Sequence, residues 1–171
     1  MPLVAMRHII SVLLANEAGA LSRVAGLFSA RGYNIESLTV APTQTPSVSR
    51  LTLTTTGSDE VIAQINKQLQ KLVDVVDLAD WTEGGHIERE ILLLKLNVAA
   101  EDVESITARA AKYGAQVLDD IPHSLTLEFT GTSSELDDFV ADMTRSGQIL
   151  ELVRSGVSAI GCGNQTLKLH G

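Results

Sequence analysis

Two turns that flank one amphipathic stretch contain the residues best suited to bind a small ligand. The first turn holds Asn16 and Gly19 and comes just before an expected helix, whose N-terminus offers unpaired N–H groups and a partial positive charge. A carboxylate suits such a helix end, and Gly19, which has no side chain, lets a ligand approach the backbone. Because an amide both donates and accepts hydrogen bonds, Asn16 suits a free amino acid, which carries a carboxylate and an ammonium group.

Both turns also have a plain structural explanation. Asn16 and Gly19 are typical of a loop that ends at a helix N-cap, and local chemistry alone favours that interpretation. In the second turn, Gly32 suits a helix C-cap, and Asn34 is a turn residue that tolerates unusual backbone angles. Residue types alone therefore leave both interpretations open.

The distance between the turns decides how a shared site would be built. About twelve helical residues separate them, which places Asn34 roughly 18 Å from Asn16 at 1.5 Å per residue. One molecule cannot easily bring both asparagines to one small ligand. If two copies pair side by side and antiparallel about a two-fold axis, the first turn of one copy meets the second turn of the other.

Hydrophobic periodicity predicts the elements that position these turns. Between the turns, one helix face is formed by apolar residues at i, i+3, i+4 and i+7, namely Leu21, Val24, Ala25 and Phe28. Apolar or alternating runs predict strands at 6–15, 34–43, 48–56 and 73–81, with a second helix from the N-cap Ser58 to about Leu72. The same order of elements repeats roughly eighty residues later, over 86–156.

This repeat predicts the fold class and the domain boundaries. We expect an α+β protein with two ferredoxin-like βαββαβ domains in tandem, each with an antiparallel sheet and helices on one face. The first domain covers 6–81 and the second 86–160, and the residues "TEGG" at 82–85 are the best linker candidate. Residues 161–171 show no periodic pattern, so we expect a loose tail there.

Composition favours some functional classes and disfavours others. The 171 residues are 44% hydrophobic, which fits folded domains, and the formal net charge of -8 disfavours binding to phosphate backbones. Aromatic residues make up only 4% of the chain, whereas a βαββαβ module that binds RNA stacks bases on aromatic side chains. No apolar run approaches the length of a membrane span, and Cys162 is the single cysteine, so we expect a cytoplasmic protein.

No convergent catalytic set is visible in the sequence. The four histidines lack a partner at metal-site spacing and are expected at exposed or edge positions; they are His8, His86, His123 and His170. Neighbouring acidic residues in a strand or helix point in different directions, which applies to Asp119–Asp120 and Asp137–Asp138. The sequence therefore predicts no catalytic residue, no metal site and no cofactor site in this chain.

Beside this reading of the residues, several stretches resemble a known family. The segment "RHIISVLLANEAGALSRVAGLFSARGYNIESLTVAPT" is similar to the start of the regulatory (small) subunits of acetolactate synthase, and "EREILLLKL", "GTSSELDDF" and "VRSGVSAIG" resemble later parts of that family. The resemblance covers about residues 7–161 and is most specific in the first half. It implies an N-terminal ACT domain, a second ferredoxin-like domain, and dimers whose ACT domains pair with the feedback inhibitor between them.

The resemblance also implies a binding site. The polar end of the inhibitor would be held by Asn16, Gly19, Ala20 and Leu21, and the paired subunit would contribute Asn34 and Ile35. The inhibitor in this family is typically valine, sometimes another branched-chain amino acid. Charge-assisted hydrogen bonds and burial of an isopropyl group, offset by association entropy, lead us to expect a dissociation constant between about 10 μM and 1 mM.

The function implied by the resemblance is that of a non-catalytic regulatory subunit. Such a subunit activates a catalytic (large) subunit and confers feedback inhibition by valine, while thiamine diphosphate, Mg²⁺ and FAD belong to the catalytic partner. Two alternatives stay open at this point. One is a free-standing tandem amino-acid-binding regulator of another enzyme or of gene expression, and the other, which the missing catalytic set disfavours, is an enzyme in its own right.

Overall fold

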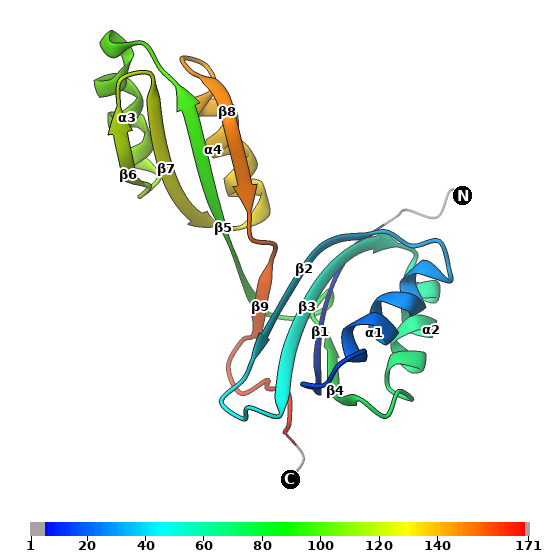
Figure 1. The fold of residues 1–171 in the computed structure, drawn as a ribbon. Coiled ribbons are helices and arrows are strands. Elements are labelled where there is room, and N and C mark those ends of the chain that lie inside the picture. The colour runs from blue at the N-terminus through cyan, green and yellow to red at the C-terminus, as the bar shows by residue number, and fades with distance from the viewer. Residues whose placement is uncertain (1–5, 170–171) are drawn as a thin grey trace. The chain divides into compact units, whose positions relative to one another are not determined.

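The computed structural model describes residues 6–169 and divides the chain into two compact units. The first unit contains the chain up to Ile87 together with the residues from Val157 onward, and the second contains Glu88–Gly156 (Figure 1). No helix within residues 6–169 is long and apolar enough to cross a membrane. The two units are therefore described separately.

The first unit has the predicted βαββαβ order. Its elements are β1 (Met6–Ala15), α1 (Ala20–Ser29), β2 (Ile35–Pro42), β3 (Val48–Gly57), α2 (Asp59–Leu69) and β4 (Val75–Asp80). The strands form an antiparallel sheet in the order β2-β3-β1-β4, and both helices cover one face of it (Figure 1). The α2 helix ends at Leu69, where its backbone continues into a turn, three residues before the predicted end.

Alternation along the two central strands builds the core of this unit. Every second residue of β1 and β3 faces the helices and is fully or almost fully buried, as seen at Ile10, Val12, Leu14, Leu51 and Leu53. The helices contribute the matching apolar face with Val24, Phe28, Ile62, Ile65 and Leu69. The core thus fixes the rotation of α1, and with it the direction in which the two flanking turns point.

The second unit repeats the architecture. Its elements are β5 (His86–Asn97), the short helix η1 (Ala100–Asp102), α3 (Val103–Lys112), β6 (Gln116–Ile121), β7 (Ser124–Gly131), α4 (Ser133–Met143) and β8 (Gln148–Arg154). The strand order β6-β7-β5-β8 matches that of the first sheet, element for element. Two tandem ferredoxin-like units with antiparallel sheets are therefore confirmed.

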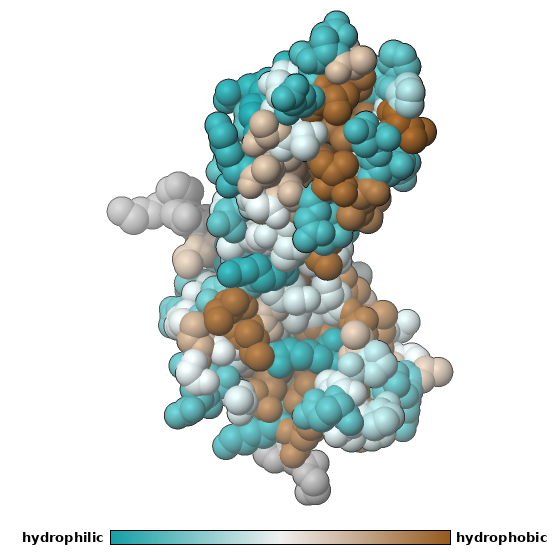
Figure 2. Space-filling model, turned by 90° about the vertical axis from the view of Figure 1, so that its left-hand side faces the viewer, coloured by the Kyte–Doolittle hydropathy of each residue, from teal (hydrophilic) through white to brown (hydrophobic). Residues whose placement is uncertain are grey.

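The second sheet leaves apolar residues exposed. Along β5, Leu92, Leu94 and Leu96 are buried against the helices, whereas Ile91 and Leu93 alternate with them and are 47% and 38% exposed. In Figure 2, apolar residues accordingly remain at the surface of this unit. An exposed apolar area of this kind is typical of an interaction surface.

The C-terminal segment differs from the prediction. Residues 157–160 belong to the first unit and not to the second, and the described part of the predicted loose tail is held in place. Strand β9 (Ser158–Gly161) pairs with β5, the Cys162 N–H donates to the Gly85 carbonyl at 3.0 Å, and the Lys168 N–H donates to Asp77 Oδ2 at 2.7 Å. The partners lie far apart in sequence, so local periodicity does not report them.

A second, smaller cluster explains why this segment returns. On the helix-free side of the first sheet, Ile9, Trp81 and Ala159 are buried together, and Leu167 packs against them. The Trp81 indole N–H also donates to Ser11 Oγ at 2.9 Å, which satisfies the one polar atom of the ring. The C-terminal residues therefore cover an apolar area that the two helices cannot reach.

Candidate functional site

The first turn is fixed to the rest of its unit by Asn16. The Asn16 side-chain nitrogen donates to the Pro46 carbonyl at 3.0 Å, and its backbone N–H donates to the Ser47 carbonyl at 2.8 Å. These contacts tie the turn to the loop between β2 and β3. The structural explanation of Asn16 is therefore correct for its amide nitrogen. Because Asn16 is exposed, its side-chain oxygen can still accept a hydrogen bond from a ligand.

Gly19 precedes the first residue of α1 and has a backbone conformation that favours glycine. Its φ of 87° lies in the left-handed region, and it is the N-cap of α1 without a side-chain cap. The Gly19 carbonyl accepts from the Arg23 N–H at 3.1 Å, so the N–H groups of Leu21 and Ser22 point out of the helix end, as helix geometry requires. These donors suit an anion, and Ala20, 1% exposed, seats the turn on the core.

Sequence reasoning missed a guanidinium beside this helix end. A Cβ atom on Gly19 would lie 3.0 Å from Arg23 Nη1. The Arg23 side chain is half exposed, and its Nε donates to Oδ2 of the buried Asp74 at 2.5 Å while Nη2 donates to Oδ1 at 3.1 Å. Arg23 follows Gly19 by four residues, about one helical turn, and this spacing could have indicated the contact. Asp74 is 51 residues further along the chain, so spacing could not have indicated the ion pair.

The ion pair shifts both titrating groups. Hydrogen bonding to Arg23 lowers the pKa of Asp74 below its ordinary value, against the opposing effect of burial. The same hydrogen bond raises the pKa of Arg23. Because the folded-state pKa of Asp74 is depressed, the pair stabilises the fold above the unfolded-state pKa of about 4, and this contribution is lost as the pH falls through the folded-state value.

Replacement of Asp74 should therefore flatten the acid limb of the stability curve. We expect Asp74→Asn to lower the urea midpoint at pH 7. Between about pH 5 and pH 2.5, an interval around the ordinary aspartate pKa, the free energy of unfolding of the variant should fall less than that of the unsubstituted chain. Urea titrations across this range measure the effect. Asp119→Asn, at an exposed position on β6, is the matched control, and equal acid limbs in both variants would contradict the assignment.

The second turn lies at the other end of α1. Asn34 is exposed, its carbonyl accepts from Thr55 Oγ1 at 2.7 Å, and the half-buried Ile35 begins β2. The helix between the turns has ten residues, which corresponds to about 15 Å. A single chain therefore does not bring Gly19 and Asn34 together, as the sequence predicted.

Strand β2 forms an edge of the first sheet. Leu38 and Val40 stand opposite Leu53 and Leu51, which are fully buried under the helices, yet they stay 36% and 42% exposed. Their exposure follows from the edge position, where no further strand or helix covers them. An edge strand of eight residues with two exposed apolar side chains invites pairing with another strand.

The four histidines of the chain are candidate metal ligands and proton carriers. Among residues 6–169, no group of three or more His, Cys, Asp or Glu side chains is arranged to hold a metal ion. The expectation of an exposed or edge position was wrong for His8, which is 3% exposed on the central strand β1. Asp59 of α2 and Thr82, which follows β4, cover it. His170 lies outside the described residues.

Comparison with known proteins places this geometry in a family. The model of an AHAS small subunit-like ACT domain matches residues 10–77, and the model of the small subunit of acetolactate synthase matches residues 89–163. The chain is 47% identical to the acetolactate synthase isozyme 3 small subunit of Salmonella typhimurium, over 95% of this chain and all of that protein. It is 44% identical to the acetolactate synthase small subunit of Haemophilus influenzae, over 95% of this chain and 99% of the relative.

A solved structure agrees with these matches. The acetolactate synthase small subunit from Thermotoga maritima superposes with a TM-score of 0.82 at 32% identity, over 94% of this chain and 99% of that one. Both the sequence matches and the structural match extend through the two ferredoxin-like units. The chain belongs to the family of acetolactate synthase small subunits, and its first unit is the ACT domain of that family.

Proposed function

We propose that this chain activates the catalytic subunit of acetolactate synthase and makes it sensitive to feedback inhibition by valine or a related branched-chain amino acid. The observation that carries the proposal is the match to small subunits over 95% of the chain, which includes both turns of the candidate site. The thiamine diphosphate, Mg²⁺ and FAD of the reaction would belong to the catalytic subunit. The single cysteine, Cys162, fits a cytoplasmic location.

The inhibitor would bind by its zwitterionic end. Its carboxylate would accept from the free N–H groups at the start of α1, in the positive field of the helix end and of Arg23. Its ammonium group would donate to amide or backbone oxygens, with Asn34 of a second copy as the principal partner. Charge-assisted hydrogen bonds of about 1.5–3 kcal/mol each and the burial of an isopropyl group are consistent with a dissociation constant between about 10 μM and 1 mM.

The second copy would attach along β2. Antiparallel pairing of two β2 strands about a two-fold axis would cover Leu38 and Val40 and satisfy the open edge of each sheet. The same symmetry would carry the Asn34 turn of one copy toward the Gly19 turn of the other. Two equivalent inhibitor sites would result, and each would need residues from both chains.

Regulation would then be a coupling between inhibitor binding and the contact with the catalytic subunit. A coupling free energy of about 1–3 kcal/mol is typical and corresponds to a change of about 5- to 150-fold in affinity. Because the candidate site lies at the surface of the ACT domain and not in its core, inhibitor binding could change how two copies pair without unfolding either one.

Reconstitution tests this function. The purified chain is mixed with an acetolactate synthase catalytic subunit, and the rate of acetolactate formation is followed with and without valine. We expect the rate to rise on addition of the chain and to fall again when valine is added. An unchanged rate and an unchanged valine response would instead favour a free-standing regulator of another system.

A further inference from the structure

A polar cavity lies on the helix-free side of the first sheet, and none of the candidate valine-site residues lines it. Its volume is about 350 Å³, and strands β2, β3 and β9 border it. The polar residues of its lining are Arg50, Gln44, Thr39, Thr43, Thr52 and Ser158. No acidic side chain contributes to the lining, although the chain as a whole carries a net charge of -8.

Arg50 is a half-buried cation without a counter-charge. Its Nη2 donates to the Ala159 carbonyl at 2.6 Å and lies 3.4 Å from Ser11 Oγ, and both acceptors are neutral. Among the described residues no carboxylate forms an ion pair with Arg50, and burial accordingly lowers its pKa. By contrast, the described partners of Arg23 and Arg154 include the carboxylates of Asp74 and Glu90.

The unused donors of Arg50 define what the cavity can bind. A guanidinium presents five N–H groups in a planar fork, and the two acceptors occupy only those on Nη2. The Nε–H and the Nη1 donors remain. Thr39 and Thr43 already donate their hydroxyl hydrogens to backbone carbonyls, whereas the Ser158 hydroxyl can donate one further hydrogen bond. Oxygen atoms of a carboxylate or a phosphate match such a set of donors.

We propose that the cavity at Arg50 binds a small oxyanion, the carboxylate or phosphate group of a metabolite, independently of the valine site. The anion supplies the counter-charge that Arg50 lacks. Because Arg50 also holds the Ala159 carbonyl of β9, an anion bound there fastens the C-terminal segment to the sheet. Binding to the folded state alone then raises the thermal stability of the protein.

Two probes of stated chemistry, inorganic phosphate and acetate, test the proposal without any activity measurement. The Arg50 Nε–Hε resonance of the full-length chain is followed by NMR at constant ionic strength while either anion is added, in the absence of valine. We expect a saturable shift at Arg50 with at least one of the two anions, accompanied by a rise in melting temperature. Their relative affinities identify the preferred head group as phosphate or carboxylate.

Charge-matched variants separate a site from general screening. The Arg50→Gln variant should lose at least nine-tenths of the rise in melting temperature that the anion causes. The Arg89→Gln variant, which removes the same charge from an exposed residue of β5, should keep this rise. If Arg50→Gln does not fold, Ser158→Ala serves instead and should weaken binding severalfold. The proposal is overturned if neither anion saturates at 50 mM, or if both arginine variants respond alike. Because valine is absent from these experiments, a negative result for anion binding does not count against the proposed valine site.

Discussion

Gly19→Asp should raise the valine concentration needed for half-inhibition of the reconstituted enzyme by about 10- to 100-fold. The new carboxylate would stand at the N-terminus of α1, beside the Arg23 guanidinium, where the inhibitor's own carboxylate is expected. Loss of one charge-assisted hydrogen bond, at about 1.5–3 kcal/mol, accounts for an effect of this size. Valine titrations of acetolactate formation measure it.

Two other glycines control for charge and for strain. Gly26 lies within α1, and a Cβ atom added there would have no atom within 4 Å beyond its chain neighbours and its own helix backbone, so Gly26→Asp adds the same charge away from the helix end. Gly114, in the second unit, has a positive φ of 79°, and Gly114→Asp therefore adds similar backbone strain away from both turns. Both control enzymes should stay sensitive to valine. Full sensitivity of the Gly19→Asp enzyme would count against the site.

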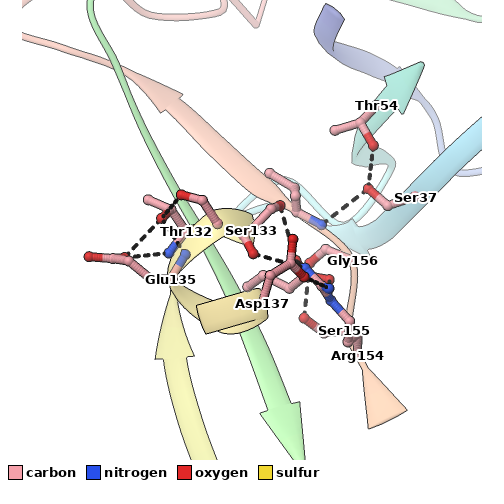
Figure 3. Close-up of polar contacts among 12 residues, drawn as sticks. Ser37, Thr54, Thr132, Ser133, Glu135, Asp137, Arg154, Ser155 and Gly156 are labelled. Carbon is pink, nitrogen blue, oxygen red and sulfur yellow. Dashed lines mark hydrogen bonds and ion pairs between the residues drawn. The ribbon is translucent and has the colours of Figure 1, made fainter. Parts of the chain in front are cut away.

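Arg154→Ala should destabilise the second unit by about 3–5 kcal/mol, because it leaves the buried Glu90 carboxylate without its counter-charge. Arg154 donates from Nε and Nη2 to the two carboxylate oxygens of the buried Glu90, at 3.1 Å and 2.8 Å. Its Nη1 also contacts Asp137 of α4, as Figure 3 shows. Urea unfolding of the full chain, followed by a probe in the second unit, measures the loss.

An ion pair with an exposed arginine provides the comparison. The side chain of Arg145 is 74% exposed and lies 3.7 Å from Asp142, so Arg145→Ala should cost less than about 1 kcal/mol. Adding Glu90→Gln to Arg154→Ala removes the unpaired charge and should recover part of the lost stability. Similar losses in the two single arginine variants would show that the Glu90 pair is not the source.

Local patterns were sufficient to predict the two-unit fold. The 3.6-residue period of α1 and the alternation along β3 depend only on neighbouring residues and on which face is buried. The placement of Asn34 and Gly19 at opposite ends of one helix followed from helix length alone. Such features can be predicted because each one is determined within a single element.

Contacts between distant residues could not be predicted in this way. Trp81 reaches Ser11 across 70 positions, and Arg50 reaches the Ala159 carbonyl across 109. The same kind of long-range packing pairs strand β9 with β5, buries His8 and brings Arg23 to Asp74. Composition and spacing contain no signal for these partners, because the sheet topology brings them together.

The central claim is that each inhibitor site combines Gly19 of one copy with Asn34 of another, and mixed dimers test it directly. Gly19→Asp and Asn34→Ala chains are first titrated with valine separately by calorimetry, and each should bind weakly. Unfolding and refolding them together in equal amounts yields about half mixed dimers, each with one undamaged site, so about a quarter of the normal sites should return. No recovery of valine binding, although mixed dimers form, would contradict a site shared between two chains.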